Sequence, residues 1–97
     1  MGYKHTVLNI VLEELDDAVK WYSGISIELS TDLASQYKIA LNKIYLNPFH
    51  SQNQKGDFRK INLDRFPYKI VYKIFPDEII VVALAHHKRK PRFWKNR

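Results

Sequence analysis

The sequence contains no cysteine among its 97 residues, which excludes disulfide bonds and any site built on a thiolate ligand or nucleophile. No apolar run approaches the roughly 20 residues of a membrane-spanning helix. The first nine residues also lack the apolar segment of a secretory signal peptide. From these absences we expect a cytoplasmic protein that does not enter a membrane.

Acidic residues are missing from the end of the chain. Residues 87–97 carry six Lys and Arg and no Asp or Glu, whereas residues 1–86 carry ten of each, so the net charge of +6 resides in the tail. Such a patch attracts phosphates or an acidic protein, unless it is only a solvated, frayed terminus. Phe93 and Trp94 favour a tail that packs onto the body or onto a partner, because large exposed aromatic side chains are costly.

The first half of the chain predicts a short strand followed by two helices. Alternation over residues 3–9 indicates the strand, and Asn9 is the expected N-cap of a helix over residues 10–23. We interpret the four acids of that helix as a solvated face rather than a metal site, because no further ligands converge on them: Glu13, Glu14, Asp16 and Asp17.

The second predicted helix begins after Ser26, its expected N-cap, and ends at Leu46 because Asn47-Pro48 stops it. Its apolar positions recur at helical spacing. The connection between the two helices is very short, which predicts an antiparallel helical hairpin. A polar loop over residues 49–57 follows.

The last third of the chain predicts three strands. They cover residues 58–63, 68–75 and 79–86, separated by Phe66-Pro67 and by the turn residues Pro76-Asp77. The third run is almost continuously apolar and β-branched, which is typical of a central strand covered on both faces.

These elements predict one α+β domain over residues 1–97: an N-terminal strand, an antiparallel helical hairpin and a three-stranded antiparallel meander, in two layers. The first strand is expected at an edge or beside the last strand.

The last third resembles the RelE/ParE superfamily of type II toxins. The shared features are Arg59 in a basic strand, Phe66-Pro67-Tyr68 at the start of the next strand, an apolar strand that ends in His86, and an Arg-x-Pro-x-x-Trp tail from Arg89 to Trp94. The helical hairpin also matches, so the resemblance covers essentially the whole chain.

The resemblance implies a basic toxin that is neutralised by an acidic antitoxin. RelE-like members cut mRNA on the ribosome and ParE-like members poison DNA gyrase, so the protein is either an endoribonuclease or a non-enzymatic inhibitor. RNase members often carry a Tyr or His near the C-terminus, and this chain has none over residues 93–97. The tail and the Phe-Pro-Tyr feature resemble the ParE-like branch more. A basic nucleic-acid-binding module without toxicity is the alternative function.

RNA cleavage by 2′-hydroxyl attack needs a base, an acid and cations that stabilise the phosphorane. The candidate catalytic residues are Arg59, Arg65, Lys69, His86 and Arg89. His86 is equally well explained as a structural residue that closes a buried strand, and His87 is expected to face solvent. The candidate partner-binding residues are Lys88, Lys90, Arg92, Phe93 and Trp94. No cofactor and no metal are expected.

Overall fold

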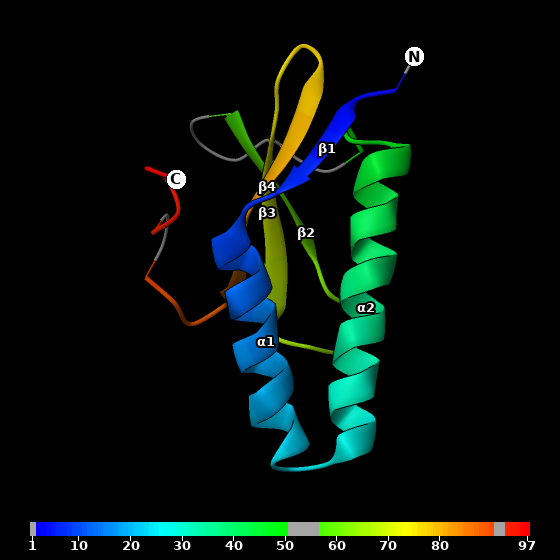
Figure 1. Ribbon diagram of the computed structural model, residues 1–97, viewed down its shortest axis with the longest axis vertical. Helices are drawn as coiled ribbons and strands as arrows, with labels where there is room; N and C mark the ends of the chain where they lie inside the picture. The colour runs from blue at the N-terminus through cyan, green and yellow to red at the C-terminus, as the bar shows by residue number, and fades with distance from the viewer. Residues whose placement is uncertain (1, 51–56, 91–92) are drawn as a thin grey trace.

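Two helices lie against one face of a four-stranded sheet, as the computed structural model shows for residues 2–50, 57–90 and 93–97 (Figure 1). The elements follow one another as β1 (Lys4–Val7), α1 (Asn9–Ser23), α2 (Ile27–Leu46), β2 (Phe58–Asn62), β3 (Tyr68–Ile74) and β4 (Glu78–His86). The α+β class and the order of elements predicted from the sequence are confirmed. No helix of the described residues is long and apolar enough to cross a membrane.

The helix ends follow the sequence signals at three of four positions. Ser26 caps α2, because its hydroxyl oxygen accepts a hydrogen bond from the Leu29 N–H at 3.3 Å. α1 ends at Gly24 and α2 ends at Asn47, before Pro48. The prediction of Asn9 as the N-cap of α1 is wrong. The N-cap is Leu8, which has an extended backbone and a side chain that cannot accept a hydrogen bond.

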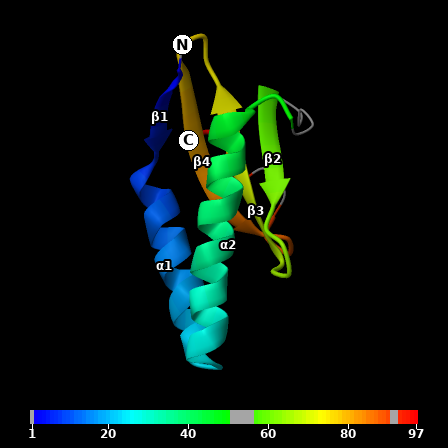
Figure 2. The same cartoon turned by 90° about the vertical axis from the view of Figure 1, so that its right-hand side faces the viewer.

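The strand order of the sheet is β1-β4-β3-β2 (Figure 2). β2, β3 and β4 form the predicted antiparallel meander, and β1 lies at the edge, parallel to β4. β4 is therefore a central strand, as its apolar run predicts. β1 reaches only as far as Val81 in the register of β4, so the second half of β4 has no strand on that side among the described residues.

A bulge in β4 decides which of its residues face the helices. Val71 pairs with Ala83 but Tyr72 pairs with Val81, so Val82 is the extra residue. Val81 and Leu84 consequently both lie on the helix side of the sheet, although three positions separate them.

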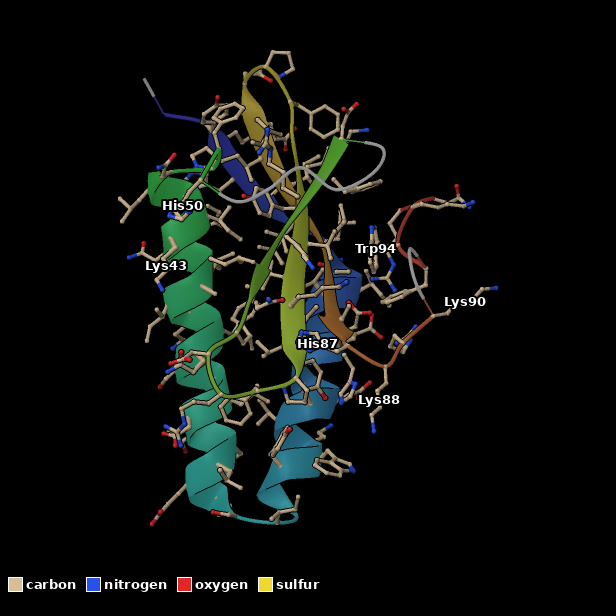
Figure 3. The ribbon with its side chains drawn as sticks, turned by 180° about the vertical axis from the view of Figure 1, so that it is seen from behind. Lys43, His50, His87, Lys88, Lys90 and Trp94 are labelled. Atoms are coloured by element: carbon tan, nitrogen blue, oxygen red, sulfur yellow. The ribbon has the colours of Figure 1, made fainter. Side chains whose placement is uncertain are left out.

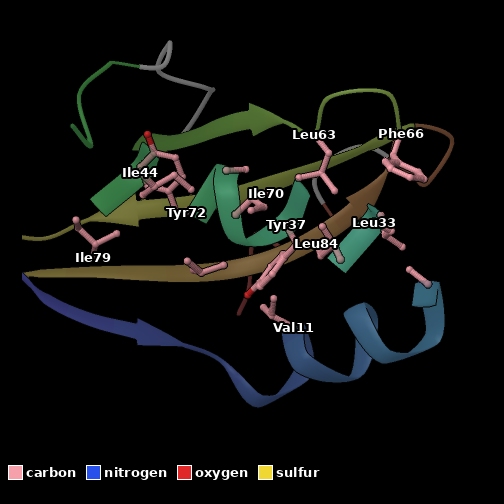
Figure 4. Close-up of a cluster of buried hydrophobic side chains, with 13 residues drawn as sticks. Val11, Leu33, Tyr37, Ile44, Leu63, Phe66, Ile70, Tyr72, Ile79 and Leu84 are labelled. Carbon is pink, nitrogen blue, oxygen red and sulfur yellow. The ribbon is translucent and has the colours of Figure 1, made fainter. Parts of the chain in front are cut away.

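Buried side chains cover both faces of the sheet. The larger cluster lies between the sheet and the helices, where Leu33, Tyr37 and Ile44 of α2 meet Ile70 and Tyr72 of β3 (Figure 4). The Tyr37 hydroxyl has no hydrogen-bond partner among the residues that the structure describes, and burial raises the pKa of Tyr37 to about 12. A second cluster covers the opposite face, here called the outer face, and consists of Phe58, Val71, Val82, Ala83, Ala85 and Trp94.

The interpretation of the four acids of α1 as a solvated face is wrong for Glu14. Its side chain is only 12% exposed, and its Oε1 atom accepts a hydrogen bond from the Leu84 N–H at 3.0 Å. Asp16 behaves as expected and forms an exposed ion pair with Lys20. The sequence does not distinguish these acids because the difference depends on which side of α1 faces β4.

Candidate functional site

Three basic side chains come together on the outer face at the end of the sheet where β4 finishes. Lys60 of β2 pairs with Val71 of β3, whose side chain is on the outer face. Lys69 comes two residues before Val71 in β3 and therefore lies on the same face. Lys69 in turn pairs with Ala85, and His87 follows two residues later, in the turn directly after β4. Diagonal neighbours of this kind are about 7–8 Å apart, within reach of long side chains. We call Lys60, Lys69 and His87 the outer-face basic cluster.

The electrostatics of the cluster show that its members act on one another. Burial, followed by the charge of Lys60, lowers the pKa of Lys69. His87 is exposed, yet its pKa is lowered below the usual 6.5, first by the partial loss of hydration next to the sheet and then by Lys69, His86 and Lys60, while a backbone hydrogen bond at Tyr68 raises it. No carboxylate offsets these shifts, so the cluster provides a positive field beside an imidazole that is neutral at pH 7.

The tail of the chain packs against this cluster through Trp94. Trp94 is 3% exposed and packs on the outer face, and the Lys69 ammonium lies 5.0 Å from the centre of its ring. Phe93 lies close to two guanidinium groups, with its ring centre 3.9 Å from Arg89 Cζ and 4.9 Å from Arg97 Cζ. Of the two expectations for Phe93 and Trp94, packing onto the body or onto a partner, the structure shows packing onto the body. A partner that reaches Trp94 must first displace the tail.

His86 lies on the other face, in a hollow of about 560 Å³ between α1 and the start of β3. Its ring meets that of Tyr68 edge to face, with centres 5.0 Å apart, and its Nδ1 atom accepts a hydrogen bond from the Lys88 N–H at 3.0 Å. Arg89 lines the same hollow, together with the acids Glu14 and Asp17. His86 therefore has the structural contacts that the sequence also allowed.

Arg59 and Arg65 lie away from the outer-face basic cluster. Arg59 pairs with Tyr72, whose side chain is on the helix side of the sheet, whereas the next residue, Lys60, pairs with Val71 on the outer face. Its guanidinium lies 5.1 Å from the centre of the Phe49 ring. Arg65 sits in the turn before β3, where its carboxylate partner on α2 is 3.8 Å away.

Some of the candidate catalytic and partner-binding residues predicted from the sequence lie close together in the structure, and others lie apart. It brings His86 next to Arg89 and places Lys69 beside Trp94 on the opposite face of the sheet. Lys88 and Lys90 are exposed on the side of the tail, and Arg92 lies outside the described residues (Figure 3). His87 is exposed, as expected from the sequence. Sequence reasoning missed Lys60 as a site residue, because its proximity to Lys69 and His87 depends on strand register.

No group of three or more His, Asp or Glu side chains that could hold a metal ion occurs in residues 2–50, 57–90 and 93–97.

We compared the chain with known protein families, curated sequences and solved structures. No protein-family model matches the chain, and no curated protein matches it in sequence. Among solved structures, the chain is similar to the chromosomal ParDE toxin–antitoxin system of P. aeruginosa, with 14% identity over 87% of this chain and 95% of that chain and a TM-score of 0.76. It is also similar to a mutant of the E. coli toxin RelE in the free state, with 20% identity over 91% of this chain and 86% of that chain and a TM-score of 0.63. The chain therefore has the RelE/ParE fold that its sequence resembles.

Proposed function

We propose that this chain is the growth-inhibiting toxin of a type II toxin–antitoxin system and acts in the cytoplasm. The similarity of the fold to the ParDE system and to RelE supports this function. The uncompensated charge at the end of the chain supports it as well, because it fits a phosphate-rich target and an acidic antitoxin.

The outer-face basic cluster is the observation that best supports a particular activity, cleavage of RNA. A phosphodiester is cut when a ribose 2′-oxygen attacks phosphorus and the bond to the 5′-oxygen breaks. His87, neutral at pH 7, is suited to accept the 2′-hydroxyl proton, and solvent returns a proton to the departing 5′-oxygen. Lys60 and Lys69 supply positive charge for the phosphorane oxygens without a carboxylate to neutralise them.

Inhibition of DNA gyrase is the second candidate activity. The observation that favours it is the higher of the two TM-scores, 0.76 against 0.63, which belongs to the ParDE structure. In this case the same basic surface binds without catalysis, and the lowered pKa of His87 has no role.

The test is induced expression of the chain in bacteria, with soluble protein confirmed and growth followed. Mapped mRNA ends and gyrase-linked DNA breaks are then compared in the same cultures. RNA cleavage that disappears in Lys69→Met and His87→Ala identifies the first activity, whereas DNA breaks with intact mRNA identify the second. Lys38→Met, an exposed lysine on α2, is the matched control. Growth equal to that of an empty vector contradicts the toxin and leaves a non-toxic nucleic-acid-binding module.

A further inference from the structure

Lys69 has an aromatic ring as its partner in the outer-face basic cluster. Its ammonium lies 5.0 Å from the centre of the Trp94 ring, within the distance of about 6 Å at which the face of a ring attracts a cation. None of the ion pairs between described residues includes Lys69. The Trp94 ring is therefore the partner of this ammonium in place of a carboxylate.

The charged neighbours of the Lys69 ammonium repel it. After burial, the charge of Lys60 is the next cause that lowers the pKa of Lys69. Lys69 is in turn the first of the charged groups that lower the pKa of His87, after the partial loss of hydration. A lysine has a flexible four-carbon stem and a strongly hydrated head. Without an attractive contact, we therefore expect the Lys69 ammonium to turn away from Lys60 into water.

The Trp94 ring is held in place by packing. It is 3% exposed and belongs to the buried cluster that Val71 and Ala85 form on the outer face. Its Nε1 atom is buried and has no hydrogen-bond partner among the described residues, so apolar contacts fix the orientation of the ring. A ring held in this way keeps the same face toward Lys69.

The segment that carries the ring is also anchored. The backbone N–H of Arg97 donates a hydrogen bond to the Trp94 carbonyl oxygen at 2.9 Å. The Arg97 guanidinium binds Glu14 and the Val82 carbonyl oxygen, each at 3.0 Å. The position of the Trp94 ring is therefore tied to both α1 and β4.

We propose that Trp94 is a positioning residue, whose ring face holds the Lys69 ammonium beside Lys60 and His87. A cation held in this way stabilises an anion better than one that must first move in from water, because no reorganisation is needed when the anion forms. That this anion is the phosphorane of a cleaved RNA rests on the proposed function, whereas the positioning of Lys69 by Trp94 does not.

A purely structural role of Trp94 gives a different pattern. A side chain that only fills space on the outer face can be replaced by an aliphatic one without moving Lys69. A side chain that holds a cation needs a π-face, which phenylalanine retains in weaker form and leucine lacks. The substitutions Trp94→Phe and Trp94→Leu therefore separate the two roles.

The first measurement uses the full chain without any substitution. Protons that lie over the face of an aromatic ring resonate upfield, so the NMR signals of the ε-methylene protons of Lys69 should lie upfield of those of Lys90, an exposed lysine of the tail. Equal positions of the two signals would show that the Lys69 side chain does not stay over the ring, and would overturn the proposal.

The second measurement is the NMR titration of the His87 ring protons in variants. Trp94→Leu should raise the pKa of His87, because a released Lys69 no longer places its charge there, and Trp94→Phe should raise it less. With Lys69→Met in the same chain, neither substitution of Trp94 should raise this pKa further. Phe93→Leu is the matched control and should leave it unchanged, because the Phe93 ring contacts Arg89 and Arg97 rather than Lys69.

Two outcomes of the titration contradict the positioning role. A rise caused by Trp94→Leu that persists in the Lys69→Met chain is an effect of hydration and not of a held cation. An unchanged pKa of His87 in a folded Trp94→Leu protein shows that Lys69 stays in place without the ring. Thermal unfolding establishes that each variant is folded, and if Trp94→Leu is not, Trp94→Phe and the Lys69 signal still decide.

The catalytic use of the held cation is measured separately. If the chain cuts RNA, Trp94→Leu should lower the cleavage rate at saturating RNA about fivefold and leave KM nearly unchanged. A chain that does not inhibit growth but shows the expected pattern at Lys69 and His87 refutes the proposed function and not the positioning role of Trp94.

Discussion

Arg97 Nη1 lies 3.0 Å from Glu14 Oε1, although 83 positions separate the two residues. The same carboxylate oxygen accepts the Leu84 N–H at 3.0 Å, and Arg97 also donates to the Val82 carbonyl oxygen at 3.0 Å. β1 pairs with β4 only as far as Val81, so these two side chains satisfy backbone groups of β4 where its neighbouring strand ends. The pair thereby ties the tail to both α1 and the sheet.

Replacing either partner should destabilise the fold. We expect Glu14→Ala to lower the free energy of unfolding by about 1–3 kcal/mol, because the Leu84 N–H loses its side-chain acceptor and Arg97 keeps only the Val82 carbonyl oxygen. Arg97→Ala should cost less, about 1 kcal/mol, because Glu14 keeps its bond to Leu84. Urea unfolding of the two single mutants and the double mutant gives the coupling energy, expected to exceed about 0.5 kcal/mol.

The control is the exposed ion pair of α1. Asp16 and Lys20 are 2.8 Å apart, with side chains 60% and 73% exposed, so Asp16→Ala should change stability by less than about 0.5 kcal/mol. Equal effects of Asp16→Ala and Glu14→Ala would mean that the contact with β4 contributes nothing.

Trp94 should matter more to stability than any basic residue of the tail. Its side chain is 3% exposed against Val71 and Ala85, so Trp94→Ala leaves a cavity and should cost about 3–5 kcal/mol. Lys90 is exposed, and Lys90→Ala should change stability by less than about 0.5 kcal/mol. Thermal unfolding of both variants makes the comparison, and a Trp94→Ala protein as stable as the parent would show that the tail does not pack on the outer face.

Arg65, a candidate functional residue, also has an unusual backbone conformation. Its φ of 70° is in the left-handed region, and its ion pair with Asp32 is exposed and 3.8 Å long. Arg65→Gly should therefore be more stable than Arg65→Ala by about 1 kcal/mol, since both lose the ion pair and only glycine removes the strain. Urea unfolding measures the difference. We also expect Arg65→Ala to retain growth inhibition, because Arg65 lies outside the outer-face basic cluster.

The fold was predictable because its elements have clear periods. Alternation over residues 68–75 predicts β3, and helical spacing up to Asn47-Pro48 predicts α2 with its end. The bulge at Val82 was not predictable, since the continuous apolar run of β4 carries no period that reveals a change of face. The faces on which His86 and His87 lie depend on that bulge.

The candidate site was less predictable because it depends on register. Arg59 and Lys60 are neighbours in sequence, yet only Lys60 reaches Lys69 and His87, because adjacent residues of a strand point to opposite faces. The polar role of Glu14 likewise depends on the approach of β4 to α1, which no local pattern records.

The titration of His87 tests the outer-face basic cluster directly. Because burial and the neighbouring cations lower its pKa in the folded state below 6.5, the unfolded chain binds more protons near pH 6. This group therefore favours folding above pH 6.5, and its contribution falls as the pH drops through the folded pKa. We expect an NMR titration of the ring protons to give a pKa below 6.5.

Replacing one neighbour should move that pKa in a defined direction. Lys69→Met removes a positive charge and should raise the pKa of His87, yet leave it below 6.5, because burial is the largest cause of the shift. Lys88→Met is the control: Lys88 is next to His87 in sequence but is not among the groups that shift its pKa. If both substitutions raised the pKa of His87 equally, the lowered pKa would result from the overall positive charge of the tail and not from the geometry of the cluster. An effect confined to Lys69→Met requires the cross-strand proximity that makes His87 a candidate base.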